Sequence, residues 1–589
     1  MLKKMRIFTK EILMVIILIL LFLFQSVITL TSKTPVFDDP AAITIGTYFV
    51  KYLDTSMYIL HPPLIYILAG LPLQFVDINL PYSYKECTEM GFYKCSQDTV
   101  FESNNDVEKI GTYSKIPFIV ISLILGLILF FFAKELYGKN AGYFTLTLYA
   151  FSPTILGYNT IIFTDLVVTF FIVSATYFLW KLLIQGYTKT RLIFAGIFLG
   201  LALASKFTAI LLIPIIVIFF IIKIIQDKNN NRKIFLRIHS VKLILILLIG
   251  LITLHASYFF SFGTITDSIP ERYLDTIESE IGKRFPEGSS SRGIVDFLVY
   301  DIKIPIPQYF AGIAAQNKIG SSGGKKGYLN GEIYEGGKWY YFFEVLLIKT
   351  QIPLIIFFIT ALIFTLRAVR GNIINELFIL IPIIFFLGVF LINNFNLGLR
   401  HILPIFPFVF LLSSRIVNIN LKNNMHNFIF KTSIVFLLLW YILITILIMP
   451  NYAAYFNELV GGPKNGHYYL LSSNLDMGQD LKKLSDYIKA KNLGTIKLSY
   501  HGSFDPSYYN ISYEPLPMEF YIPWVSGFDP DKPKQNYKEN CSKKQGIMAI
   551  SVSNLHNYHL LNKSCFKWLN DYSPIKKIGY TIFIYNVTD

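Results

Sequence analysis

The 589 residues are 53% hydrophobic, 16% aromatic and only 15% charged, and their mean hydropathy is +0.49. This balance excludes an ordinary soluble globular protein and indicates an integral membrane protein. The formal net charge is +15, but the Lys and Arg residues cluster in the connections on alternate sides of the apolar segments, as they do in membrane proteins. No basic soluble module of a nucleic-acid-binding type is visible, so we predict no nucleic-acid partner.

The first apolar segment, residues 11–30, follows several basic residues and resembles a signal peptide in this respect. It is nearly long enough to cross a bilayer, however, and the sequence that follows it, TSKTPVF, contains no small-residue cleavage site. We therefore predict that this segment is retained as a transmembrane helix.

Further apolar segments follow along the chain, so we predict an α-helical polytopic membrane protein with about eleven transmembrane helices. The helices are expected near residues 11–30, 115–133, 141–157, 165–183, 192–205, 207–225, 242–261, 341–364, 376–392, 402–417 and 433–450. With the N-terminus in the cytoplasm, every inside connection is basic, whereas the short outside turns hold only Lys206 and Arg400. The odd number of helices then places residues 451–589 outside the cytoplasm, in a protein of the cell membrane.

The predicted organisation is a transmembrane domain, residues 1–450, followed by an extracytoplasmic domain, residues 451–589. The first outer loop, residues 31–114, contains the proline-rich apolar stretch 61–75, which we interpret as a juxtamembrane or re-entrant helix because counting it as a span would place the basic connections outside. The second outer loop, residues 262–340, is rich in Gly, Ser, Lys and Pro. It is typical of a mobile loop that covers a site, or of a plain flexible connector.

The composition after residue 450 shifts towards Asn, Tyr, Lys, Pro and Ser, and the pattern predicts a small α/β domain. Helices are expected near residues 478–491 and 565–571, and strands near 495–500, 547–553 and 580–587. All four cysteines fall outside on this topology, Cys87 and Cys95 in the first loop and Cys541 and Cys565 in the last domain. Two local disulfides are expected in an oxidising compartment, and four unpaired thiols are the alternative.

Two adjacent acids, Asp38 and Asp39, follow the first predicted helix in the segment VFDDPAAITIG. One carboxylate could remove a proton from a hydroxyl nucleophile while the other orients it, so we treat both as candidate catalytic residues. The alternative is a helix cap, because an acid before Pro40 is well suited to begin a helix.

Three further outer turns carry ionisable residues. Asp165 begins a predicted span, where it could support the site or simply cap the helix. Lys206 interrupts two apolar runs, and a Lys near the hydrocarbon region should reach the membrane surface or an anion such as a lipid phosphate. Arg400 offers a planar fork of donors suited to phosphate oxygens, and His401 beside it could donate a hydrogen bond.

His61 and Glu458 are weaker candidates for a supporting role, since a His before two prolines is more often structural and Glu458 could merely cap a turn. The sequence shows no Cys/His metal spacing and no nucleotide-binding loop. We therefore predict no firm cofactor. A divalent cation is the alternative, for which Asp165 alone in its turn is a weak signal.

Eight segments occur together in a characteristic order: FDDPAAITIGTYF, HPPLIYILAGLP, the FTD turn, GLALASKFTA, GGKWYYFFEVLLIKT, GLRHILPIFPF, YFNELVGGP and SSNLDMGQDL. In this order the chain resembles dolichyl-phosphate-mannose protein mannosyltransferases, which are membrane glycosyltransferases of the GT-C architecture in glycosyltransferase family 39. The resemblance runs over about residues 37–482.

The resemblance implies an inverting transfer of a sugar from a polyprenyl-phosphate carrier to an acceptor hydroxyl, on a protein or on a glycan or lipid, at the outer face of the membrane. It implies that Asp38 is the base or acceptor-orienting carboxylate and that Lys206 binds the donor phosphate, with Asp165 matching the acid of the second outer turn. Asp39 stands where the family has Glu. Arg400 and His401 match an Arg-His pair of this subgroup.

The segment SSNLDMGQDL departs from the family pattern at Ser472 and Met477. If these residues contact the acceptor, its identity should differ here. A transporter or flippase of lipid-linked sugars is the rival function, but such proteins often show internal repeats and place polar groups at broken helices near the membrane midplane. The sequence shows no repeat, and its acids and bases lie at the outer helix ends.

Overall fold

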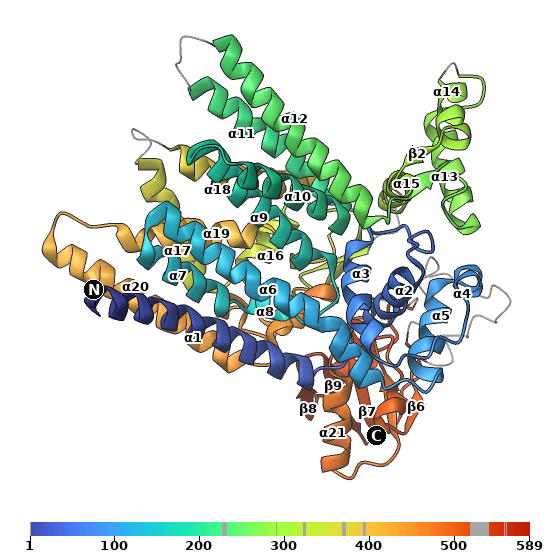
Figure 1. The fold of residues 1–589 in the computed structure, drawn as a ribbon. Helices are drawn as coiled ribbons and strands as arrows, with labels where there is room; N and C mark the ends of the chain where they lie inside the picture. The colour runs from blue at the N-terminus through green and yellow to red at the C-terminus, as the bar shows by residue number, and fades with distance from the viewer. Residues whose placement is uncertain are drawn as a thin grey trace.

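A computed structural model of the protein describes residues 2–226, 232–289, 291–321, 326–367, 373–392, 396–518, 541–558, 560 and 562–588. Figure 1 shows a large bundle of helices, a group of short helices from residues 39–102 at one end of it, a helical arm beside that group, and a small sheet domain at the same end. The predicted fold class, a helical polytopic protein with a small C-terminal α/β part, is confirmed.

Seven helices among the described residues are long and apolar enough to cross a membrane. They lie within α1 (Leu2–Ser32), α6 (Val107–Tyr137), α9 (Thr164–Ile184), η3 with α11 (Phe207–Leu211, Leu212–Gln226), α12 (Arg232–Ser257), α18 (Ile374–Ile392) and α20 (Asn424–Ile448). An eighth is present if α16 (Tyr341–Lys349) and α17 (Ile352–Arg367), which meet at an angle of 114°, form one broken span. The protein is therefore an integral membrane protein, although the expected count of eleven helices is not confirmed.

Three of the predicted spans are interrupted or are shorter than a helix that crosses the bilayer core. Residues 141–157 are divided between two helices, α7 (Lys139–Ala150) and α8 (Pro153–Tyr158), and the second begins at a proline. Residues 402–417 divide among η5 (Leu399–Ile402), α19 (Ile405–Ser413) and η6 (Ser414–Asn418). The third, α10 (Lys189–Ser205), has 17 residues and is about 25 Å long, which is just below the thickness of a bilayer core.

Helix α10 packs between α9 and α12. Its two small residues, Gly196 and Gly200, face α12 so closely that a Cβ on Gly200 would lie 2.4 Å from the carbonyl oxygen of Gly250. Small residues four apart allow helices in membranes to approach in this way. The close contact fixes the end of α10, where Lys206 follows.

Residues 39–102 form short helices at the end of the bundle next to the sheet domain (Figure 1). They are α2 (Asp39–Tyr52), α3 (Leu64–Gly70), η1 (Leu71–Phe75), α4 (Tyr84–Met90), α5 (Phe92–Gln97) and η2 (Asp98–Glu102). The predicted apolar stretch 61–75 is a short helical segment. It packs on α2 at Gly46 and Gly70, where a Cβ on Gly70 would lie 2.0 Å from the Gly46 carbonyl oxygen. The Cys87–Cys95 disulfide joins α4 to α5.

Residues 262–321 form a helical arm, so the prediction of a mobile loop or plain connector is wrong for the described part of this segment. The arm contains β1 (Phe262–Gly263), α13 (Glu271–Arg284), α14 (Arg292–Asp296), η4 (Phe297–Asp301), β2 (Ile304–Pro305) and α15 (Pro307–Ser321). Apolar residues of α13 four apart, Tyr273, Ile277 and Ile281, build a small core with Val299 and α15. The Gly and Ser content conceals this periodicity. Residues 290 and 322–325 lie outside the described residues.

A hairpin, β3 (Lys326–Leu329) and β4 (Glu332–Glu335), leads back to the bundle. After α20 come η7 (Tyr452–Ala454), η8 (Glu458–Val460), η9 (Gly466–Tyr468) and η10 (Ser472–Asn474). The α/β part contains α21 (Leu481–Ala490), β5 (Ile496–Ser499), η11 (Pro506–Tyr509), β6 (Tyr513–Pro515), β7 (Gly546–Ser551), α23 (Val552–Leu555), η12 (Lys567–Asp571), β8 (Lys576–Ile578) and β9 (Ile582–Val587). Its sheet has the order β6-β5-β7-β9-β8, and the Cys541–Cys565 disulfide closes the segment before β7 onto the chain after α23.

Candidate active site

Three charged residues from distant parts of the chain meet at one end of the bundle. The Lys206 ammonium lies 2.5 Å from one carboxylate oxygen of Asp165, and the Arg400 Nε lies 4.0 Å from the other. The Asp165 side chain is almost fully buried. Two cations therefore share one carboxylate, which leaves a net positive charge in a region of low solvent access.

Each of these residues sits where a helix begins or ends. Asp165 is in the first turn of α9, Lys206 follows the last residue of α10, and Arg400 is in η5. The Arg400 guanidinium lies over the ring of Phe163, 4.1 Å from its centroid, which fixes its plane. Its Nε is buried and has no hydrogen-bond partner among the described residues. This leaves one directed donor for an anion.

The two histidines predicted beside this cluster lie near it. Burial, followed by the charges of Lys206 and Arg400, lowers the pKa of His61 to about 4, so His61 is neutral at physiological pH. His401 follows Arg400 in η5 and is within electrostatic range of Asp165. His61 can therefore take part in hydrogen bonding without adding a full positive charge, since an imidazole is neutral well above its pKa.

Asp38 has an exposed side chain, and its carboxylate makes no hydrogen bond among the described residues. Enough protein still surrounds the carboxylate for desolvation to raise its pKa, an effect that the charge of Arg400 partly opposes and that of Asp39 reinforces. Asp38 is therefore an accessible carboxylate within electrostatic range of the cation cluster. An unpaired carboxylate with a raised pKa is suited to accept a proton.

Asp39 is placed differently from its neighbour. Its carboxylate is fully buried and lies 2.7 Å from the ammonium of Lys115, which is on α6. The same carboxylate accepts hydrogen bonds from the backbone N–H groups of Val36 and Ile162. Its lone pairs are therefore directed at the scaffold, so the geometry favours Asp38 over Asp39 as the residue that contacts a substrate.

Glu458, the last of the predicted site residues, lies in η8 with an exposed side chain. Within the described residues, no hydrogen bond or ion pair joins its carboxylate to Asp165, Lys206 or Arg400. The structure thus brings Asp38, His61, Asp165, Lys206, Arg400 and His401 to one region and does not connect Glu458 to it.

The segment that precedes Asp38 is fastened to the chain at residues 477–479. The N–H of Thr34 donates to the carbonyl oxygen of Gln479, and the N–H of Phe37 donates to that of Met477, at 3.0 and 3.1 Å. The Met477 side chain is itself buried. Residues 477–479 therefore act here as a support for the Asp38 loop, a role that the sequence motif does not reveal.

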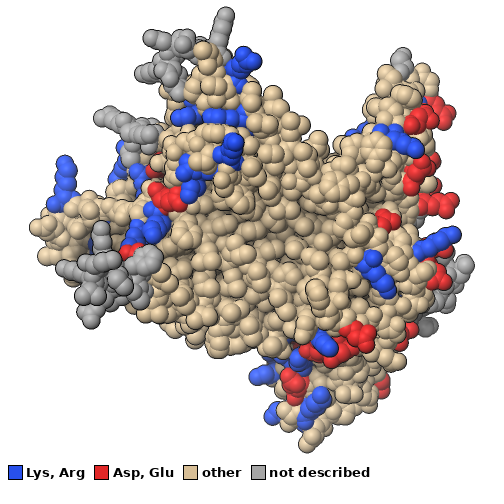
Figure 2. Space-filling view, viewed as in Figure 1, with Lys and Arg blue, Asp and Glu red and all other residues tan. Residues whose placement is uncertain are grey.

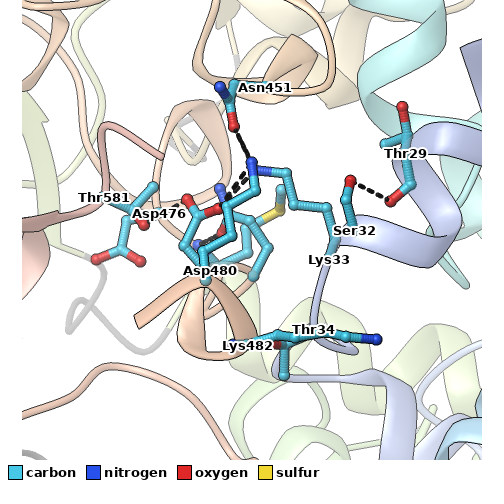
Figure 3. Close-up of polar contacts among 12 residues, drawn as sticks. Thr29, Ser32, Lys33, Thr34, Asn451, Asp476, Asp480, Lys482 and Thr581 are labelled. Atoms are coloured by element: carbon cyan, nitrogen blue, oxygen red, sulfur yellow. Dashed lines mark hydrogen bonds and ion pairs between the residues drawn. The ribbon is translucent and has the colours of Figure 1, made fainter. Parts of the chain in front are cut away.

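A buried ion pair reinforces this support, as Figure 3 shows. The Lys33 ammonium reaches from the end of α1 to Asp480, 2.6 Å away, and also donates to the side-chain oxygen of Asn451. Thr581 donates to the other oxygen of Asp480. The α/β part is therefore tied to α1 next to the candidate base. The roles of Lys33 and Lys115 could not be read from the sequence, because both residues stand at the edge of apolar runs, where charges usually mark a helix end.

The arm contacts both loops that carry the site. Gly312 of α15 packs between the chain at Ile59 and the ring of Phe207, and a Cβ on it would lie 2.3 Å from the Ile59 carbonyl oxygen and 2.5 Å from Phe207. Gln316 donates to the carbonyl oxygen of Leu60. Because His61 follows Leu60 and Lys206 precedes Phe207, α15 helps to set the positions of both residues.

We expect Gly312→Ala to reduce activity at this site about 10- to 100-fold, because the added methyl group must displace the backbone of Ile59 and thereby shift His61 relative to Lys206. Catalytic rate and thermal stability should be measured together. Gly293→Ala is the matched control, since a Cβ at this arm position meets nothing within 4 Å. Wild-type activity in Gly312→Ala would contradict the positioning role.

Within the described ranges, no group of three or more His, Cys, Asp or Glu side chains is arranged to hold a metal ion. We accordingly assign no metal ligands. The described residues of the site supply one accessible carboxylate, a paired cation cluster and two imidazoles.

The sequence model of one protein family, dolichyl-phosphate-mannose-protein mannosyltransferase, matches residues 111–251. These residues include Asp165 and Lys206. The chain is a glycosyltransferase resembling this family. The predicted resemblance is thereby confirmed, and no curated protein matches the glycosyltransferase chain significantly.

Solved structures similar to this glycosyltransferase include ArnT from Cupriavidus metallidurans bound to undecaprenyl phosphate, with 11% sequence identity, a TM-score of 0.46 and 97% of each chain covered. AglB, an oligosaccharyltransferase from Archaeoglobus fulgidus, has 13% identity and a TM-score of 0.43, with 72% of this chain and 55% of that chain covered. The Pmt1-Pmt2 O-mannosyltransferase complex of S. cerevisiae has 16% identity and a TM-score of 0.31, with 42% and 33% covered.

Proposed function

We propose that this protein transfers a sugar from a polyprenyl-phosphate carrier to an acceptor hydroxyl at the extracytoplasmic face of the membrane, with inversion at the anomeric carbon. The donor is a membrane lipid, and the acceptor hydroxyl belongs to a protein or to a glycan or lipid. The family match and the contents of the site support this reaction.

The observation that carries the proposal is the unequal charge of the buried cluster. Lys206 and Arg400 present two positive charges against the single carboxylate of Asp165. A sugar-phosphate diester carries one negative charge, so it matches the uncompensated cation. When the sugar leaves, negative charge grows on the phosphate oxygens, and fixed cations that are already in place stabilise that charge in the transition state.

In the proposed reaction, Asp38 acts on the acceptor side and the cations act on the donor side. Asp38 removes the proton of the acceptor hydroxyl as its oxygen forms a bond to the anomeric carbon. The bond from that carbon to the phosphate oxygen breaks, and its electron pair goes to the phosphate held by Lys206 and Arg400. Direct displacement needs no covalent enzyme intermediate, and it inverts the configuration. Asp39 and Lys115 hold the Asp38 loop and take no part in the bond changes.

The proposed topology has the N-terminus in the cytoplasm and the site and α/β domain outside. Figure 2 supports it, since Lys and Arg gather at the end of the bundle far from the sheet domain. That end contains Lys134, Lys139, Lys181 and Arg191, in or beside the helix termini. An excess of basic residues in short connections marks the cytoplasmic side. The two disulfides, at the opposite end, suit an oxidising compartment.

Lys206→Met tests the proposed donor site. We expect it to weaken binding of dolichyl-phosphate mannose or undecaprenyl-phosphate sugars about tenfold or more, because a charge-assisted contact to the phosphate is lost. Binding is measured on the purified protein with radiolabelled donors, and transfer is measured with acceptor peptides and glycolipids. Lys85→Ala, an exposed lysine of the first loop, is the control and should bind as wild type.

Removing Lys206 also takes away one of the two positive charges that compensate the buried Asp165 carboxylate, and this loss is expected to destabilise the fold. The double variant Asp165→Asn/Lys206→Met removes both charges of the pair, so it should regain thermal stability without regaining donor affinity. Donor binding and transfer by this stable double variant at the wild-type level would refute the assigned phosphate site.

A further inference from the structure

The arm exposes an apolar face that its own fold does not use. Ile294, Phe297 and Leu298 are 64%, 54% and 47% exposed. Their spacing of three and four residues places them together on one side of the helical stretch formed by α14 and η4. Exposed apolar side chains grouped in this way mark an interaction surface.

These three residues are not a missing part of the arm's core. That core already contains Tyr273, Ile277 and Ile281 of α13, packed against Val299 of η4 and against α15. Val299 faces inward from the same helical stretch on which Phe297 and Leu298 face outward. One face of the stretch therefore packs on the core of the arm, and the other face is apolar but exposed.

The arm begins where a membrane span ends. Helix α12, whose apolar part Ile234–Ser257 is a candidate span, is followed within a few residues by Phe260 and Phe262, both strongly exposed. Another exposed aromatic residue, Trp339, precedes α16, which packs on η5 of the site. Aromatic side chains at helix ends are typical of the boundary between lipid and water.

Figure 1 shows that the arm extends sideways from the end of α12, across the direction in which the spanning helices run. Figure 2 shows Asp and Glu gathered along the edge of the arm that faces away from the bundle. Exposed acids on α13 include Glu271, Asp275 and Glu278. If the arm lay on a membrane, this acidic edge would face the aqueous solution.

We propose that the arm lies on the membrane surface at the site end of the bundle and inserts Ile294, Phe297 and Leu298 among the lipids. An apolar face opposed by an acidic edge is the arrangement of an element that lies in the interface of a bilayer. The lipid surface continues from the exposed face of α12, so the same bilayer that surrounds the bundle provides the partner.

This contact has a consequence for the site, because the arm is continuous with α15. Gly312 and Gln316 of α15 touch the chain at Ile59 and Leu60, next to His61, and Gly312 also touches Phe207, next to Lys206. Anchoring the arm in lipid therefore restrains the two loops from outside. The membrane contact itself does not depend on the proposed reaction, so the two can fail separately.

Phe297→Cys provides the test, because all four native cysteines are paired in disulfides and the new thiol is unique. The thiol is labelled with bimane, and the full-length protein is placed in phosphatidylcholine liposomes that contain nitroxide-labelled lipid. We expect a blue shift of the emission and strong quenching by the nitroxide lipid. Asp275→Cys, on the acidic edge, is the matched control and should be quenched by aqueous iodide instead.

Leu298→Cys should behave as Phe297→Cys does, which guards against a local effect of one substitution. The proposal is overturned if the labels at 297 and 298 are quenched by iodide as strongly in liposomes as the label at 275. It is also overturned if they are shielded from both iodide and nitroxide lipid, since a protein surface would then cover the face.

Discussion

Replacing Asp38 with Asn should lower sugar transfer by about 10²- to 10⁴-fold while leaving donor binding intact, because the change removes a general base and little else. The carboxylate makes no hydrogen bond among the described residues, and the side chain is exposed, so an amide of the same shape should fit without strain. Turnover and donor affinity are measured separately on purified protein. A fall in affinity alone would assign Asp38 to substrate binding.

The pH dependence gives an independent check. Desolvation raises the pKa of Asp38, although Arg400 partly opposes the shift. A base works only when ionised, so transfer should fall as the pH drops through this raised pKa. The pH at which the transfer rate falls on the acidic side should then lie above the pKa of about 4 expected for an ordinary Asp. Asp38→Glu should retain some transfer with a similar fall at acidic pH, whereas the residual transfer of Asp38→Asn should not show this fall.

Asp77→Asn is the matched control, since Asp77 is an exposed acid in the same outer loop. It should show wild-type transfer and an unchanged pH profile. Undiminished transfer by Asp38→Asn would remove the proposed base and leave the reaction without a proton acceptor at this position.

The convergence of Asp165, Lys206 and Arg400 could be predicted from sequence because all three lie in short turns between apolar segments. Turns on the same side of a membrane protein are confined to one surface, and charges there have few partners other than one another. The membrane class followed from composition for a similar reason, since long apolar segments have no other stable environment in water. The short elements after residue 450 were readable from strand patterns bounded by turn residues.

The number of spans was harder to predict because hydropathy measures how apolar a segment is and not how it bends. The turn of 114° between α16 and α17 lies within a run that reads as one helix, and Pro153 separates α7 from α8 inside another. The arm was misread for the opposite reason. Its Gly, Ser and Lys residues suggested a loop, while the core that orders it depends on Val299 and Ala311, distant from α13 in sequence.

The different roles of Asp38 and Asp39 also could not be read from the sequence. Adjacent residues at the start of a helix point in different directions, and which one meets a partner depends on a residue far along the chain. Here that residue is Lys115, which stands at the beginning of a predicted apolar run and pairs with Asp39. The same holds for Lys33, whose partner Asp480 is 447 residues away.

The Asp39–Lys115 pair should have the largest effect on stability of any single contact near the site. Both side chains are almost completely buried, and the ion pair is 2.7 Å long. Removing one member of a buried pair leaves a charge without compensation, which typically destabilises a protein by about 3–5 kcal/mol. We therefore expect Lys115→Met to lower the apparent melting temperature strongly and to reduce the yield of folded protein in detergent.

The double variant Asp39→Asn/Lys115→Met removes both charges, so it should recover much of the lost stability. It should not recover full transfer, because the buried carboxylate also accepts the N–H groups of Val36 and Ile162 and thereby fixes the loop that presents Asp38. An Asn side chain has only one oxygen to offer to two donors. A decrease in turnover with unchanged donor affinity would identify Asp39 as a positioning residue.

Melting temperatures are compared with those of Lys85→Ala, whose exposed ion pair with Glu89 should contribute little to stability. If Lys115→Met melts like this control, the buried pair does not hold the loop, and the support of Asp38 must lie in residues 477–480.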